Sequence, residues 1–107
     1  MIRQDYFERL IEQLAGAIAR VLGLVAESKY EDAAREIDGC YRALGVTPVM
    51  LGRLAPATLV AMLGAEKAEA VAKVLDAEAG ILRAQGRDVE AYAKNRDAET
   101  IRRVAGG

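Results

Sequence analysis

The residues of this chain that could do chemistry are one cysteine and several neighbouring carboxylates. Cys40 is the only thiol among 107 residues, and the chain contains no histidine. A cysteine nucleophile needs a base or a nearby cation to form its thiolate, and the usual imidazole base is missing here. Cys40 also falls on an apolar helical stripe between Ile37 and Leu44. The sequence therefore predicts a buried structural thiol rather than a nucleophile or a redox sensor.

Three pairs of neighbouring carboxylates could hold a metal ion or exchange protons: Glu8 with Glu12, Glu31 with Asp32, and Asp97 with Glu99. Glu8 and Glu12 are four residues apart, so they share one edge of a helix. Di-metal sites of helical bundles combine such residues with a Glu-x-x-His motif, which this chain lacks. Mg²⁺ held by carboxylates alone is the alternative, but these pairs are more typical of solvated helix faces. We predict no enzymatic activity, no metal and no cofactor.

The charge balance points away from nucleic acids. Lys and Arg total 15, Asp and Glu total 16, and both signs are interspersed along the chain. A nucleic-acid interface usually shows a basic patch and a basic isoelectric point. No apolar run approaches the ~20 residues that span a bilayer, and the opening residues lack the pattern of a signal peptide. We therefore expect a cytoplasmic protein that binds neither nucleic acid nor membrane.

The elements that must position these residues are helices, and the first is the strongest. Its apolar residues repeat at four-three spacing: Phe7, Ile11, Leu14, Ile18, Val21 and Val25. One flank adds Leu10, Ala17 and Leu24, and the other adds Ala15 and Leu22. Together they fill roughly half of the helix circumference, with Ile18 at the centre. A stripe of that width predicts contact with at least two other helices.

The rest of the chain predicts further helices separated by turn signals. A second helix is expected over about 30–44, after a short turn. Ser28 is expected to cap the start of this helix, and Gly45 is expected to end it. Thr47, Pro48 and Pro56 predict two short helices within 45–64, the most apolar stretch, which forms either a core plug or an exposed contact surface. Two apolar stripes run along 65–85, and a last helix covers about 88–104.

These elements predict a single all-α domain over 1–107 with about five helices. We expect one antiparallel hairpin at about 4–44, short apolar helices at 45–64 and a second hairpin at about 65–104. Because the connecting turns are short, consecutive long helices should pack against each other.

Two segments resemble the turn of a tetratricopeptide repeat. Residues 28–34 read Ser-Lys-Tyr-Glu-Asp-Ala-Ala, and residues 85–91 read Gln-Gly-Arg-Asp-Val-Glu-Ala. In both, a small or flexible residue makes the turn, acids favour the start of the next helix, and alanine allows close helix contact. The opening Met-Ile-Arg-Gln-Asp-Tyr-Phe-Glu-Arg-Leu-Ile-Glu-Gln-Leu is similar to the start of a small family of uncharacterised bacterial proteins. That resemblance implies a fold and a bacterial origin but no activity.

The function that follows from these features is a non-catalytic protein–protein interaction module, most simply a homodimer. The surplus of apolar helix surface supports this interpretation, because exposed apolar patches usually mean a partner. The predicted contact residues are those on one flank of the first helix and in the apolar middle: Leu10, Ala17, Leu24, Met50, Leu51 and Met62. The alternative is a helical binding protein that encloses an apolar small-molecule pocket near Tyr30, Tyr41, Met50 and Met62.

Overall fold

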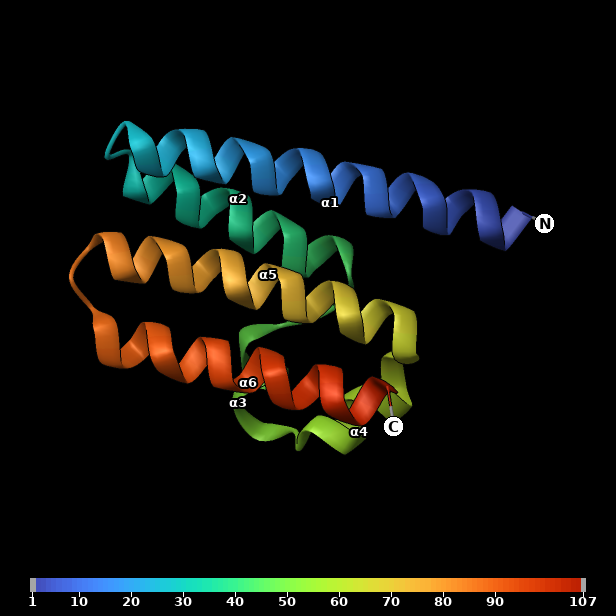
Figure 1. Ribbon diagram of the computed structural model, residues 1–107. Coiled ribbons are helices and arrows are strands. Elements are labelled where there is room, and N and C mark those ends of the chain that lie inside the picture. The colour runs from blue at the N-terminus through green and yellow to red at the C-terminus, as the bar shows by residue number, and fades with distance from the viewer. Residues whose placement is uncertain (1, 107) are drawn as a thin grey trace.

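The computed structural model describes residues 2–106, with side chains described from Asp5 onward. Within this range the chain forms six helices and no strand, which confirms the all-α prediction. The helices are α1 (Ile2–Ala26), α2 (Tyr30–Ala43), α3 (Pro48–Arg53), α4 (Pro56–Leu63), α5 (Ala65–Ala84) and α6 (Asp88–Gly106). Figure 1 shows the four long helices side by side, with α3 and α4 joining α2 to α5.

α1 and α2 lie against each other and run in opposite directions (Figure 1). The turn between them carries two backbone hydrogen bonds typical of a helix C-terminus, from Lys29 N–H to the Leu24 carbonyl and from Ser28 N–H to the Val25 carbonyl. Ser28 has a positive φ of 62°. The prediction that Ser28 caps α2 is therefore wrong, because its backbone closes α1, and the N-cap residue of α2 is Lys29.

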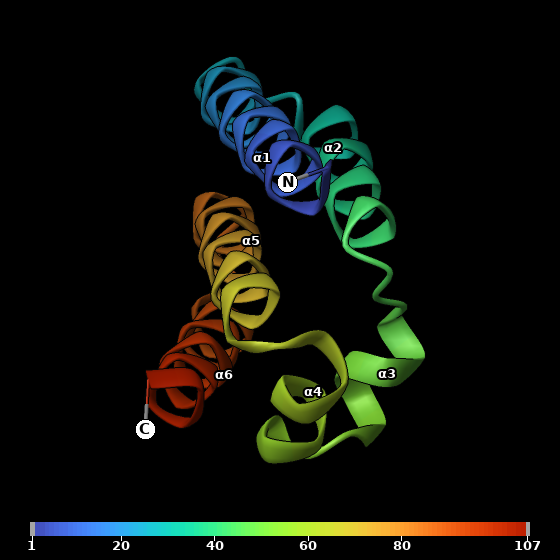
Figure 2. The same cartoon turned by 90° about the vertical axis from the view of Figure 1, so that its right-hand side faces the viewer.

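The buried face of α1 is centred about 70° around the helix axis from Ile18, the predicted centre of the stripe. The buried residues are Leu10, Leu14, Ala17 and Val21, whereas Ile18 is only half-buried. Figure 2, which looks along the helices, shows α1 beside α2 and above α5. Contact with two helices was the expectation, but α2 covers the Leu10 flank more completely than α5 covers the opposite flank.

The apolar segment before α5 acts mainly as a core plug. Thr47 accepts a hydrogen bond from the Met50 N–H at 3.2 Å, and Pro48 occupies the first turn of α3, as predicted. Leu59 of α4 is buried. Most other large apolar residues here pack partly against the core: Met50, Leu51, Leu54, Val60 and Leu63. α4 contacts α5 and α6, and Figure 2 shows it beside α6.

α5 is the central helix of the fold. It contacts α1, α2, α4 and α6, and in Figure 2 it lies between α1 and α6. Its two predicted apolar stripes are both buried within this one chain, except for half-buried Ala77 and exposed Ala84. α6 buries Ala91, Ala98 and Ile101 against the core, while its Val89 and Tyr92 are exposed.

Candidate functional site

The structure places Cys40 on α2, within the buried core. Its side chain is 3% exposed, and burial raises the pKa of its thiol. The carboxylate of Glu36, on the same helix, raises that pKa further, and the Arg20 guanidinium lowers it by a smaller amount. A raised pKa lowers the thiolate fraction at neutral pH, so this environment opposes nucleophilic chemistry.

The carboxylates that could have bound a metal ion lie apart on the surface. Glu8 and Glu12 are exposed on α1. Asp32 pairs with Arg35, and the Glu99 carboxylate lies 3.5 Å from the Arg103 guanidinium. Among the side chains that the structure describes, no three His, Cys, Asp or Glu residues gather as a metal site would require.

The predicted contact residues divide into buried and surface positions. Leu10 and Ala17 are 3% and 7% exposed, so they belong to the core and are not on a surface that a partner reaches. The physical reason is that α2 runs back along this flank of α1. Leu24 is half-buried on the same flank, and Met50 and Leu51 pack partly against the core. Only Met62 among the six is largely exposed, at 60%.

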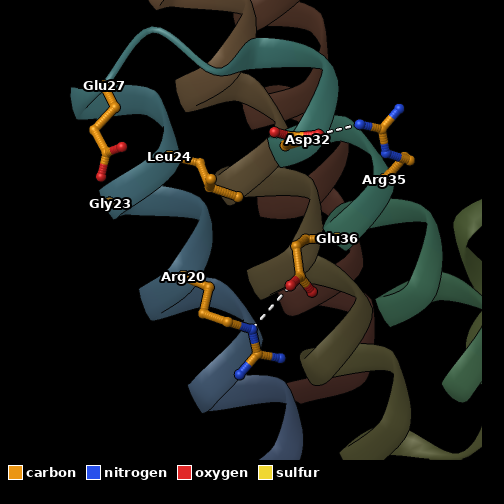
Figure 3. A pocket seen from close by; sticks show the side chains of 7 residues that line it. All are labelled: Arg20, Gly23, Leu24, Glu27, Asp32, Arg35 and Glu36. Carbon is orange, nitrogen blue, oxygen red and sulfur yellow. Dashed lines mark hydrogen bonds and ion pairs between the residues drawn. The ribbon is translucent and has the colours of Figure 1, made fainter.

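The cleft between α1 and α2 is shown in Figure 3. Leu24 and charged residues of both helices line this open cavity of about 530 Å³. Arg20 Nε donates to Glu36 Oε1 at 2.9 Å across the two helices, and Asp32 pairs with Arg35 along α2. These charged groups pair with one another. The Arg20–Glu36 bridge holds α2 against the Leu10 flank of α1, and the cleft keeps few unpaired charges for a ligand.

The opposite flank of α1 carries exposed apolar side chains. Its residues again follow four-three-four-three spacing, and we call them the α1 seam: Ile11, Ala15, Ile18, Leu22 and Val25. Leu22 is 64% exposed, Ala15 is exposed, and the other three are half-buried. Ile11, Ala15 and Ile18 meet Ala70 and Lys73 of α5 around a small cavity of about 50 Å³. α5 therefore covers one edge of the seam and leaves its outer side open.

The seam is also free of charge along most of its length. Between Gln13 and Glu27 the only charged residue of α1 is Arg20, which is turned toward α2 by its bridge to Glu36. Exposed Ala19 and Ala26 border the seam on its outer side. The contact residues predicted for this helix, Leu10, Ala17 and Leu24, lie on the other flank. The second four-three series was visible in the sequence, but the helix that covers each flank was not.

A second surface feature lies between α2 and α6, which we call the α2–α6 groove. Its floor is α5, and its volume is about 350 Å³. Twelve residues line it: Tyr30, Glu31, Ala34, Ile37 and Asp38 of α2, Glu78, Ile81 and Leu82 of α5, Gln85 and Arg87 of the following turn, and Glu90 and Lys94 of α6. The groove could not be predicted from the sequence, because it depends on how the two helix pairs pack.

The residues proposed for an apolar small-molecule pocket are spread over three helices. Tyr30 and Tyr41 lie three turns apart on α2, and Tyr41 is buried with its hydroxyl donating to Glu78 Oε1 at 2.7 Å. Met50 is on α3, and Met62 is exposed on α4. Of the four side chains, only Tyr30 lines the α2–α6 groove.

None of the six helices is long and apolar enough to cross a membrane. Comparisons of the chain with family models, with curated proteins and with solved structures find no match.

Proposed function

We propose that this protein is a non-catalytic interaction module that self-associates through the α1 seam. The observation that carries the proposal is the exposed apolar Leu22 within an uncharged four-three series on a helix whose other side is already packed. A four-three spacing is the pattern by which one helix packs along another. Covering the exposed part of Leu22 would contribute about 1–2 kcal/mol per copy.

The distribution of charge beside the seam favours an antiparallel pair of α1 helices. Glu8 and Glu12 are exposed near its N-terminal end, whereas Ala19 and Ala26 border its C-terminal half. A parallel pair would set the acidic ends of the two copies against each other, and like charges that face each other across two packed helices repel. An antiparallel pair sets each acidic end against the alanine half of the other copy. It also brings the large Leu22 of one copy toward the small Ala15 of the other.

The test is the solution mass by light scattering across a hundredfold concentration range. We expect twice the mass of one chain at the upper end. Leu22→Lys should return the protein to a single chain with unchanged helix content by circular dichroism. Val89→Lys is the matched control, because Val89 is 86% exposed on α6 and lies outside the seam. A single-chain mass for the unaltered protein throughout, or equal behaviour of the two variants, would contradict the proposal.

A further inference from the structure

The α2–α6 groove has two helical walls and an apolar floor. α5 packs against both α2 and α6, and its buried Ile81 and Leu82 line the bottom of the groove. Half-buried Tyr30 stands at the start of the α2 wall, followed by exposed Ala34 and buried Ile37. The groove therefore offers both an aromatic ring and aliphatic surface to a ligand.

The charged groups of the groove leave an excess of negative charge on the α2 wall. Arg87 is already paired with Glu90, which lowers the pKa of that carboxyl. Lys94 Nζ lies 3.6 Å from Glu78 Oε1. Arg87 and Lys94, the two cations of the groove, are therefore each paired with a carboxylate that also lines the groove. Within the described part of the chain, Glu31 and Asp38 take part in no ion pair.

The spacing of the two remaining carboxylates sets the geometry of a complementary ligand. Glu31 and Asp38 are seven residues apart on one face of α2, which corresponds to about 10.5 Å along the helix axis. Residues three apart in a β-strand point to opposite sides. An extended segment in the polyproline II conformation has three residues per turn and rises about 3.1 Å per residue, so residues three apart in it share one side and span about 9 Å.

We propose that the α2–α6 groove binds an extended basic segment of a partner protein, with two Arg or Lys residues three positions apart. One cation pairs with Glu31 and lies against the Tyr30 ring, where a cation–π contact adds to the ion pair. The other cation pairs with Asp38. The residues between them lie over Ala34 and Ile37. This site is separate from the α1 seam and does not depend on self-association.

The test uses a dye-labelled peptide, acetyl-Arg-Leu-Ala-Arg-amide, and the full chain carrying Leu22→Lys, so that any self-association is removed. Binding is followed by fluorescence anisotropy at low salt. The double variant Glu31→Gln/Asp38→Asn should weaken binding at least about tenfold, since charge-assisted pairs are lost at both positions. The matched control is Asp97→Asn/Glu99→Gln, which neutralises two exposed carboxylates of α6 outside the groove. It should change binding less than about twofold.

A second peptide, acetyl-Leu-Arg-Arg-Ala-amide, keeps the composition and charge but sets the cations side by side. Weaker binding of this peptide supports the spacing that the groove imposes, and equal binding overturns it. Absence of binding by the Leu22→Lys chain, or equal loss in both double variants, overturns the site itself. Circular dichroism of each variant establishes that a loss of binding is not a loss of fold. These outcomes are independent of the light-scattering result, so the two proposals can fail separately.

Discussion

The Tyr41 hydroxyl donates a hydrogen bond to Glu78 Oε1 at 2.7 Å and so joins α2 to α5. Tyr41 is 5% exposed, and the same carboxylate oxygen lies 3.6 Å from Lys94 Nζ of α6. Three helices therefore meet at one carboxylate at the inner edge of the α2–α6 groove. Burial is the main cause that raises the pKa of Tyr41 well above its ordinary value, and the negative charge of Glu78 adds to it.

This raised pKa predicts that the fold loses stability in base. Tyrosine in the unfolded chain ionises near pH 10. Below that pH both states keep the phenol neutral, and its contribution to stability is complete. Above it the unfolded chain releases the Tyr41 proton while the folded chain retains it, so unfolding becomes more favourable by about 1.4 kcal/mol per pH unit. The loss continues until the pH reaches the raised folded-state value.

The measurement is urea unfolding of the unaltered protein and of Tyr41→Phe between pH 7 and pH 11. At neutral pH the variant should be less stable by about 1–2 kcal/mol, because a hydrogen bond to a charged group is removed. Above pH 10 the difference between the two should shrink, since only the unaltered chain can ionise at this position. A constant difference across the range would show that Tyr41 titrates normally in the folded protein.

The burial pattern of α1 gives a prediction that separates core from seam. Leu14 is 5% exposed, whereas Ile18 is half-buried beside α5. Leu14→Ala should cost about 2–4 kcal/mol, since it leaves a cavity under two helices. Ile18→Ala should cost about 1 kcal/mol, because part of its surface is already in water. Both values come from urea unfolding at a concentration where the chain is a monomer. If the two substitutions lowered the free energy of unfolding equally, Ile18 would be as buried as Leu14 and would lie at the centre of the buried stripe.

Periodicity and turn residues were enough to predict the helices of this fold. The Thr47-Pro48 start of α3 and the two-sided burial of α5 depend on neighbouring residues and on spacing alone, and both are confirmed. The direction in which α1 faces was not predictable in the same way. An apolar arc that covers half of the circumference does not fix which side of α1 faces the core. The positions of α2 and α5 decide that Val21 is fully buried while Leu22 is exposed.

The candidate surfaces were harder to predict for the same reason. Leu10 and Leu22 are both leucines at the edge of one stripe, but α2 covers the first and nothing within the chain's described residues covers the second to a similar extent. The α2–α6 groove brings Glu31 near Lys94, residues 63 positions apart. No local pattern connects them. The tetratricopeptide-like turns and the bacterial family remain predictions that the structure does not address.

The position of Cys40 predicts a thiol that reacts slowly while the protein is folded. It is 3% exposed, and burial raises its pKa, so both access and thiolate fraction are low. Reaction with a disulfide reagent at pH 8 should be at least about 100-fold slower in the folded protein than in denaturing urea, since it requires local opening. The chain has one cysteine, so the signal has a single origin. Similar rates in both conditions would place Cys40 at the surface.

The turn at Ser28 predicts a stabilising substitution. Three helices end with the same pair of backbone hydrogen bonds, and the left-handed position is Gly45 after α2 and Gly86 after α5, but Ser28 after α1. A side chain at that position costs about 1 kcal/mol relative to glycine. Glycine gains more freedom in the unfolded chain, which offsets part of this benefit. Ser28→Gly should therefore raise the free energy of unfolding by about 0.5 kcal/mol, and Gly86→Ser should lower it by a similar amount. Both variants are measured by urea unfolding. If Ser28→Gly is less stable than the unaltered protein, the serine hydroxyl stabilises the turn by more than the left-handed backbone conformation costs.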